Sequence, residues 1–198
     1  MCGLSATGKT ALGLRSTKRK IIGDDETCWS DQGIFNIEGG CYAKTINLDR
    51  KIEPEIYDSI RYGSIVENCS FYPHSREINF NDVSLTPNSR TAFPLEFLKN
   101  VHLPSIGPHP SNLIFLTCDT KGVLPPVARL TDEQAYYQFL SGYTAKMGGT
   151  DLTSKLPEST FSACFGEIFL PLHPTVYAKM LYDKIKKHNV KVWLVNTG

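Results

Sequence analysis

The amino-acid sequence predicts a mixed α/β fold, and three observations support this prediction. The stretch Gly3–Thr10 fits the glycine-rich pattern G-x-x-x-x-G-K-S/T, which normally joins a strand to a helix. The apolar runs Leu113–Asp119 and Lys191–Asn196 are short, bounded by polar residues and typical of buried strands. The segments that begin at Thr131 and Pro174 have the amphipathic periodicity of helices. Strands and helices therefore mix along the whole chain.

The composition is that of an ordinary globular chain. Its 198 residues are 41% hydrophobic and 21% charged, and the formal net charge of +1 indicates no footprint for nucleic acid or an anionic membrane. The six cysteines form no C-x-x-C pair, and no apolar run approaches the roughly 20 residues of a membrane span. We therefore expect free thiols, no nucleic-acid or membrane partner, and a soluble cytoplasmic location. The sequence does not reveal the oligomeric state.

The glycine-rich loop is the strongest local signal for function. In loops of this pattern, backbone N–H groups converge on nucleotide phosphates, the lysine reaches the β- and γ-phosphates, and the hydroxyl binds Mg²⁺. Only Met1 and Cys2 precede the loop, which is too short for the strand that normally leads into it. The pattern is thus either part of a longer chain or a chance match. The candidate phosphate-binding residues are Gly3, Leu4, Ser5, Ala6, Thr7, Gly8, Lys9 and Thr10.

Two acidic residues follow the loop at a short distance. Thr10–Leu14 is predicted to begin a helix, and Ile21–Glu26 reads as a short buried strand that ends in carboxylates. Asp24 and Asp25 at that strand end are candidate ligands for a nucleotide-bound metal, because hard cations prefer oxygen ligands. The alternative is a solvated acidic turn.

The middle third of the chain is predicted to be β-rich. Gly33–Ile46 has period-2 stretches and a Gly-Gly break, which predict a strand, a turn and a second strand or short helix. Glu53–Ile60 is predicted to form a short helix with proline at its start. Ser64–Ser70 and Glu77–Phe80 are predicted strands. The proline-rich segment Val101–Asn112 is predicted to be an exposed loop, with solvent-facing His102 and His109.

The last third is predicted to alternate strands and helices. The helix that opens at Thr131 is expected to run to about Lys146, and the helix Pro174–His188 to follow the irregular segment Gly148–Ser159. Asp119, at the end of a buried strand, either lines a ligand site or caps a helix. The residues expected on the inward faces of the two helices are Ala135, Phe139, Leu140 and Tyr143 in the first and Val176, Met180, Leu181 and Ile185 in the second.

Several ordered motifs resemble one enzyme family from end to end of the chain. They are Gly3–Thr10, Ile22–Trp29, Phe35–Thr45, Phe115–Val127, Phe139–Lys146, Thr160–Gly166 and Trp193–Gly198. In this order they closely resemble ATP-dependent phosphoenolpyruvate carboxykinase. The resemblance implies a gluconeogenic carboxy-lyase that converts oxaloacetate and ATP into phosphoenolpyruvate, ADP and CO₂, with Mg²⁺ on the nucleotide and Mn²⁺ at the substrate.

The resemblance also implies an architecture. Residues 1–198 would form a single partial domain, the phosphate-loop-containing ATP-binding domain of the family, with a twisted mixed sheet flanked by helices and truncated at both ends. The N-terminal substrate domain, with the family's substrate-binding arginine and tyrosine, would be absent. The chain alone is therefore expected to be inactive. The alternatives are a degenerate nucleotide-binding protein without lyase activity and another small kinase with a phosphate-binding loop, which the later motifs argue against.

Residue roles follow from the same resemblance. Lys9 would bind the β- and γ-phosphates, Thr10 the nucleotide-bound Mg²⁺, and Asp25 the second metal with support from Asp24. Glu53 would contact the nucleotide and Arg90 the γ-phosphate, so Lys9, Asp25 and Arg90 are the candidate catalytic residues.

Two departures from the family pattern concern the nucleotide site. Ala6 replaces a usual glycine of the loop, where a methyl group requires a negative φ. Leu152 stands where an arginine near the adenine is usual, and Ser154–Glu158 replaces a threonine-rich run. Both are expected to weaken nucleotide binding.

Overall fold

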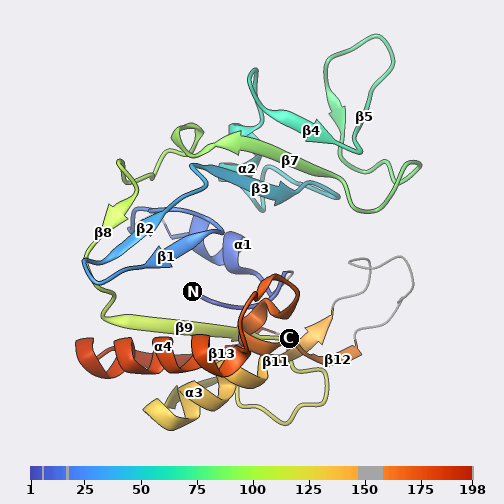
Figure 1. Cartoon of the computed structure of the whole chain (residues 1–198). Helices are drawn as coiled ribbons and strands as arrows, with labels where there is room; N and C mark the ends of the chain where they lie inside the picture. Colours follow the sequence, from blue (N-terminus) through green and yellow to red (C-terminus); the bar gives the residue numbers. More distant parts are fainter. Residues whose placement is uncertain (6, 17, 147–157, 198) are drawn as a thin grey trace. The chain divides into compact units, whose positions relative to one another are not determined.

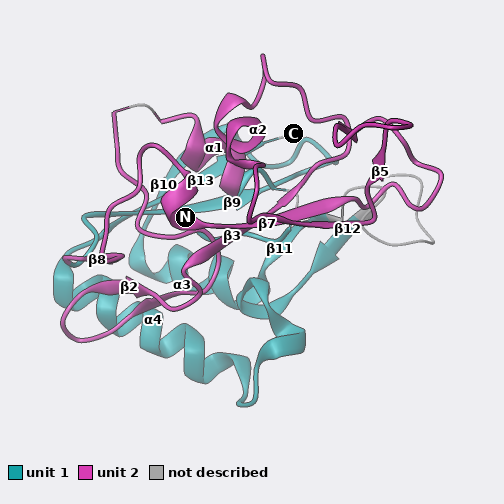
Figure 2. Ribbon diagram, turned by 90° about the horizontal axis from the view of Figure 1, so that it is seen from above, with its two compact units in different colours: residues 1–9, 109–198 teal, residues 10–108 magenta. Residues whose placement is uncertain are grey.

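The computed structural model describes residues 1–5, 7–16, 18–146 and 158–197 and shows the predicted mixed α/β fold. Helices and strands are interspersed along the chain (Figure 1), and the strands form small sheets rather than one large one. The chain divides into two compact units, residues 1–9 with 109–198 and residues 10–108, which Figure 2 distinguishes by colour. The divergent segment around Leu152 lies outside the described residues, as does Ala6.

The first unit, residues 1–9 with 109–198, is built on a three-stranded mixed sheet. Its strands are β9 (Asn112–Thr117), β10 (Val127–Leu130) and β13 (Lys191–Asn196), in the order β10-β13-β9. β13 runs parallel to β9 and antiparallel to β10. β11 (Tyr143–Lys146) and β12 (Glu158–Phe161) form a separate antiparallel pair. Both predicted buried strands of this unit are thus confirmed, in β9 and β13.

The residues ahead of the loop add one bridge to this sheet. The Cys2 amide donates to the Ile114 carbonyl at 2.8 Å, and the Leu116 amide donates to the Cys2 carbonyl at 2.8 Å, in parallel pairing with β9. Two residues are too few for a strand, as expected. They nevertheless place the start of the loop at the edge of β9.

Two helices of this unit begin where the sequence predicts. α3 (Asp132–Ser141) begins with a capping box, in which Thr131 Oγ1 accepts from the Gln134 amide at 3.2 Å and Gln134 Oε1 accepts from the Thr131 amide at 2.9 Å. The prediction that this helix reaches Lys146 is wrong. It ends because Gly142 is left-handed (φ 56°), and the chain continues as β11.

α4 (Pro174–His188) has the predicted bounds, and the prediction of its buried face is correct for Ile185 but wrong for Val176 and Met180. Ala178 and Ile185 are buried, whereas Val176 and Met180 are 41% and 56% exposed. A small residue at the contact allows a helix to pack closely, so Ala178 rather than a longer side chain marks the inward face. α3 and α4 pack against each other, and Phe139 of α3 lies over Phe115 of β9 with ring centroids 6.0 Å apart. The 3-10 turns η2 (Ala163–Phe165) and η3 (Glu167–Phe169) precede α4.

The second unit, residues 10–108, carries most of the short strands. Its main sheet has the antiparallel order β3-β7-β4, formed by β3 (Gly40–Lys44), β7 (Arg90–Pro94) and β4 (Ile65–Glu67). A second sheet joins β1 (Thr27–Trp29), β2 (Ile34–Asn36) and β8 (Ile106–Gly107), and β5 (Ser70–Phe71) pairs with β6 (Ile78–Asn79). The unit also contains α1 (Lys9–Leu14), which starts at the unit boundary, α2 (Pro54–Ser59) and the turn η1 (Leu95–Phe97). The β-rich middle third and both predicted short helices are confirmed.

The core of the second unit joins α1 and α2 to the β3-β7 pair. Its buried residues are Leu14, Cys41, Ala43, Leu48, Ile56, Phe93, Leu95 and Leu98.

Three local predictions for this part of the chain are wrong. Ile21–Glu26 makes only an isolated bridge, between Ile21 and Val101, and its last residue, Glu26, has a left-handed φ of 44° where the chain turns before β1. Ser64–Ser70 is divided between two strands by Asn68, whose φ is 54°. His109, expected in solvent, is half-buried and stacks on His188 with ring centroids 3.6 Å apart. His102 is exposed, as predicted.

Two further expectations concern cysteines and membrane spans. All six cysteines lie within the described residues and are thiols outside any disulfide, as the sequence predicts. Among the described residues, no helix combines the length and the apolar character needed to cross a membrane.

Candidate functional site

Within the glycine-rich loop, later residues donate hydrogen bonds to the backbone of Leu4, the second residue of the loop. The Leu4 carbonyl accepts hydrogen bonds from the Thr7 hydroxyl at 2.7 Å, the Thr7 amide at 3.3 Å and Lys9 Nζ at 3.2 Å. Thr7 is only 1% exposed, and its carbonyl accepts from Thr197 Oγ1 at 3.2 Å. Gly8 has a φ of +89°, a conformation that favours glycine. Gly3 and Leu4 are half-buried, whereas Ser5 and Gly8 are exposed.

Helix α1 begins at Lys9, directly after the loop, and Thr10 is its second residue. This is the order that the loop pattern predicts, with helical amides following the glycines.

Thr10 and Asp24 are brought together in the second unit. Thr10 Oγ1 donates to Asp24 Oδ1 at 2.8 Å, and the Cys41 thiol donates to Asp24 Oδ2 at 3.1 Å. Both oxygens of the carboxylate thus have a donor from the protein. Gly23 lies directly against the side chain of Asn36, so a Cβ at this position would collide with the amide. Glycine here allows the chain to approach β2 and holds Asp24 in its place.

A group of carboxylates surrounds this contact. Burial raises the pKa of Glu38, and the neighbouring charges of Asp25, Asp24 and Glu26 raise it further. Burial and the same aspartates raise the pKa of the Cys41 thiol, which is therefore a neutral donor at pH 7. No group of three or more His, Cys, Asp or Glu side chains within the described ranges has the arrangement of a metal site.

Asp25 is exposed, and its backbone shapes the turn before β1. Its carbonyl accepts from Asn36 Nδ2 at 2.6 Å and from the Thr27 hydroxyl at 3.3 Å.

Arg90 lies on a sheet face with a second cation. It is the first residue of β7, and the strand register places it beside Lys44 of β3 on one side and Glu67 of β4 on the other. Burial lowers the pKa of Lys44, and the charge of Arg90 lowers it further. Arg90 Nε donates to Asn88 Oδ1 at 3.1 Å, and the guanidinium lies 4.9 Å from the ring centroid of Tyr42. Sequence reasoning missed Lys44 and Tyr42, although their spacing in the strand places both on one face.

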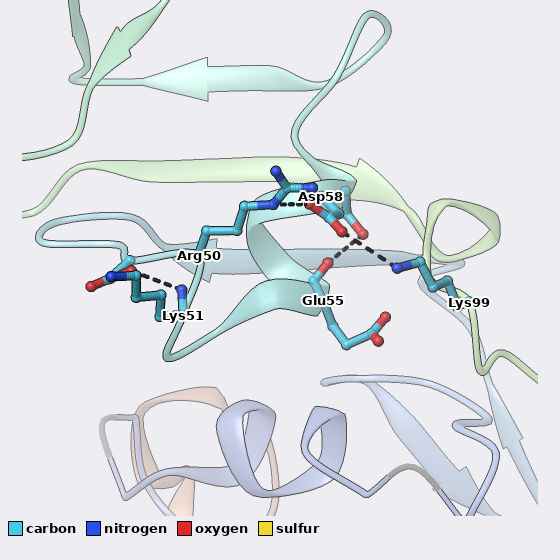
Figure 3. A network of polar contacts seen from close by, with 7 residues as sticks. Arg50, Lys51, Glu55, Asp58 and Lys99 are labelled. Carbon is cyan, nitrogen blue, oxygen red and sulfur yellow. Dashed lines mark hydrogen bonds and ion pairs between the residues drawn. The ribbon is translucent and has the colours of Figure 1, made fainter.

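Glu53 borders a pocket of about 250 Å³ in the second unit. The residues that line it come from the last part of α1 and the residue after it, and from the segment that leads into α2 with the first turn of that helix: Ala11, Leu14, Arg15, Lys51, Ile52, Glu53, Pro54, Glu55 and Ile56. Apolar walls with a few charged groups are typical of small-molecule sites. Asp58 of α2 pairs with Arg50 and Lys99, one at each carboxylate oxygen, at 2.9 and 3.4 Å (Figure 3).

Asp119 holds a turn in the first unit. Its carboxylate accepts from the amides of Lys121, Val123 and Leu124 at 2.9, 2.6 and 2.7 Å, and from the Tyr143 hydroxyl at 2.9 Å. These bonds, led by the one from the Leu124 amide, lower the pKa of Asp119 to about 2. Sequence reasoning assigned Asp119 to a ligand site or a helix cap. All of its acceptor capacity is instead directed to the turn after β9 and to β11.

Fold and loop together define the class of the protein. It is a mixed α/β protein in which a G-x-x-x-x-G-K-T loop leads into a helix and the threonine of that loop binds an aspartate further along the chain. The family model for phosphoenolpyruvate carboxykinase matches residues 1–198, and the chain belongs to that family.

Curated relatives agree with this assignment over almost the whole chain. It is 54% identical over 197 residues to "Phosphoenolpyruvate carboxykinase (ATP)" of Neurospora crassa, covering 99% of this chain and 32% of the relative. The proteins of the same name in Candida glabrata and Amoebophilus asiaticus are 55% and 56% identical, again over 99% of this chain and over 36% and 38% of their own length. The chain therefore spans about a third of the length of these relatives.

Proposed function

We propose that this chain carries the ATP- and metal-binding part of an ATP-dependent phosphoenolpyruvate carboxykinase. In the reaction, the C–C bond to the departing CO₂ of oxaloacetate breaks, and its electron pair forms an enolate. The enolate oxygen then takes the γ-phosphoryl group of ATP, which leaves ADP and phosphoenolpyruvate. Residues 1–198 would belong to one ATP-binding domain of the family, with a cytoplasmic location.

The observation that carries the proposal is the hydrogen bond of 2.8 Å between Thr10 and Asp24. The two residues stand in the loop and in the acidic segment that follows it, and both segments match the family. In phosphate-binding loops, the hydroxyl after the lysine and an aspartate on a neighbouring segment share the nucleotide-bound Mg²⁺. The contact between them supports a role for both residues at the metal ions of one nucleotide site.

Cationic groups are available to balance the phosphate charge. Phosphoryl transfer depends mainly on positioning and on neutralising charge at the phosphate oxygens. We assign Lys9 to the β- and γ-phosphates and Arg90, with Lys44 beside it, to the γ-phosphate. Glu53 and the pocket that it borders would hold the nucleoside.

The donor set fits a hard divalent cation. Thr10 offers a hydroxyl and Asp24 and Asp25 offer carboxylates, which are ligands that Mg²⁺ and Mn²⁺ accept. We assign Thr10 to the nucleotide-bound Mg²⁺ and Asp25, supported by Asp24, to Mn²⁺. When bound, these ions supply positive charge next to the phosphates and the enolate.

Calorimetric titration of the purified chain with Mg·ATP tests the nucleotide site. We expect binding by the wild-type chain and none by Lys9→Ala, because the loop lysine makes the main contact to the terminal phosphates. Lys191→Ala is the matched control, since Lys191 is an exposed lysine on β13. Equal binding by the wild type and Lys9→Ala would show that the loop is not the site.

A coupled assay for phosphoenolpyruvate separates the nucleotide site from the complete reaction. We expect the 198-residue chain to form no phosphoenolpyruvate from oxaloacetate and ATP, because it spans only about a third of the relatives' length. ATP-dependent formation of phosphoenolpyruvate by the isolated chain would contradict this division. Absence of Mg·ATP binding in the wild type would instead favour a degenerate member of the family.

A further inference from the structure

One face of the β3-β7-β4 sheet carries the side chains around Arg90. Residues two apart in a strand point to the same side, and the strand register aligns two rows across the sheet. One row is Lys44, Arg90 and Glu67, and the other is Tyr42, Ala92 and Ile65. Tyr42 is 40% exposed and Ile65 is 72% exposed, so this face is open to solvent. The opposite face carries Cys41, Ala43 and Phe93, which are buried in the core.

Two contacts restrict the guanidinium of Arg90, and a third fixes one of the two partners. The Nε–H of Arg90 donates to Asn88 Oδ1 at 3.1 Å, and its Cζ lies over the Tyr42 ring, 4.9 Å from the centroid. The Tyr42 hydroxyl in turn donates to the Glu67 carboxylate on β4, which ties the ring across β7. A tyrosine that is held at its hydroxyl end offers the cation a surface of fixed orientation.

We propose that Tyr42 and Glu67 are positioning residues, which hold the guanidinium of Arg90 so that its terminal N–H donors face the γ-phosphate of ATP. Asn88 uses the Nε–H, so the four N–H bonds of the two terminal nitrogens are the ones that a phosphate meets. A preoriented arginine binds a phosphate oxygen with less loss of side-chain freedom than a mobile one. The inference rests on the proposed role of Arg90 at the γ-phosphate, and it adds to that role the two residues that set its orientation.

The ratio of the affinities for ATP and ADP is the readout. Only ATP has the γ-phosphate, so a loss of orientation at Arg90 weakens ATP and leaves ADP unchanged, whereas general damage to the fold weakens both. The probes are Mg·ATP and Mg·ADP, titrated calorimetrically into the full chain. We expect the ratio to fall about twofold to fivefold in Tyr42→Leu, as the loss of an exposed cation–π contact predicts. A smaller fall is expected in Tyr42→Phe, which keeps the ring and loses only the bond to Glu67.

Two further variants complete the set. Tyr62→Phe is the matched control, because Tyr62 belongs to the same unit and is fully exposed. Arg90→Gln tests the proposed function itself and is expected to lower the ratio about tenfold or more, since a hydrogen bond to a charged group is lost. The NMR signal of the Arg90 Nε–H is a second measurement that needs no nucleotide. Stacking on Tyr42 shifts this proton upfield, and we expect the shift to disappear in Tyr42→Leu.

The outcomes separate the inference from the function on which it rests. A lower ratio in Arg90→Gln and in both Tyr42 variants, with an unchanged ratio in Tyr62→Phe, supports the inference. A lower ratio in Arg90→Gln alone overturns the inference and leaves the role of Arg90 intact. An unchanged ratio in Arg90→Gln overturns both.

Discussion

The contact between Thr10 and Asp24 is the part of the site that mutation tests most directly. Thr10→Val replaces the hydroxyl by a methyl group of nearly the same shape, and so removes the donor that lies 2.8 Å from Asp24 Oδ1. The Cys41 thiol still donates to the other carboxylate oxygen at 3.1 Å. The substitution therefore isolates a single hydrogen bond.

Its magnitude follows from the charge and exposure of the partners. A hydrogen bond to a charged group contributes about 1.5–3 kcal/mol to stability. Thr10 and Asp24 are both half-buried, and water replaces part of the lost bond, so we expect a decrease of about 1 kcal/mol in the free energy of unfolding. Asp24→Asn should cost a similar amount, and the double variant should cost about as much as either single one.

Tryptophan fluorescence during urea unfolding measures these stability differences, provided that the signal comes from the compact unit that contains Thr10. Trp29 lies in the unit that contains Thr10, and Trp193 lies in the other. The double-mutant cycle of Thr10→Val and Asp24→Asn is therefore made in a Trp193→Phe background. Thr10→Ser is the matched control, because it keeps the hydroxyl and should retain most of the stability. In titrations, Thr10→Val should bind Mg·ATP about tenfold more weakly and Thr10→Ser nearly as well as the wild type. Fully additive single effects in the cycle would refute the hydrogen bond as the link between loop and acidic segment.

Two further predictions concern the first unit, and Trp193 fluorescence during urea unfolding measures both. The folded pKa of Asp119 is about 2, below the usual value for aspartate, so its stabilisation is present at neutral pH and is lost as the pH falls through about 2. Asp119→Asn should therefore be less stable than the wild type at pH 7, with a difference that shrinks towards pH 2; a difference independent of pH would contradict the role of the carboxylate. Phe115 is completely buried, with the rings of Phe139 and Phe165 at 6.0 and 5.7 Å, so Phe115→Ala should lose about 4 kcal/mol, and a loss below about 2 kcal/mol would show that the core collapses around the gap.

Elements that depend on local signals were predictable from the sequence. The bounds of α4 follow from Pro174 at its start and from the left-handed residue Asn189 at its end, and α3 opens with the capping box that Thr131 and Gln134 encode. β9 and β13 are apolar runs of strand length in a parallel pair, and such strands are recognisable without knowledge of their partners.

Features that depend on tertiary contacts were not predictable in the same way. Which side of α4 is buried depends on how closely the helix packs. Ile185 was predicted on that side, but the small Ala178 completes it although Val176 and Met180 are more hydrophobic than alanine. The segment Ile21–Glu26, predicted as a strand, pairs only through an isolated bridge between Ile21 and Val101, and nothing in its residue types indicates how far its backbone finds a partner.

The candidate site likewise contains residues that local sequence predicts and residues that only tertiary contacts bring together. The loop and the acidic segment are close in sequence, and their residue types alone predicted a joint role for Thr10, Asp24 and Asp25, to which the structure adds the contact between the first two. The neighbours of Arg90 come from β3 and β4, and their alignment with β7 is a matter of strand register, which side-chain alternation within one strand does not determine. Alternation in β3 already places Tyr42 and Lys44 on one face, so a single known pairing, Lys44 with Arg90, is sufficient to bring all three together. The residues of the loop could thus be assigned from the sequence, whereas the residues proposed to orient Arg90 could be found only from the strand pairing.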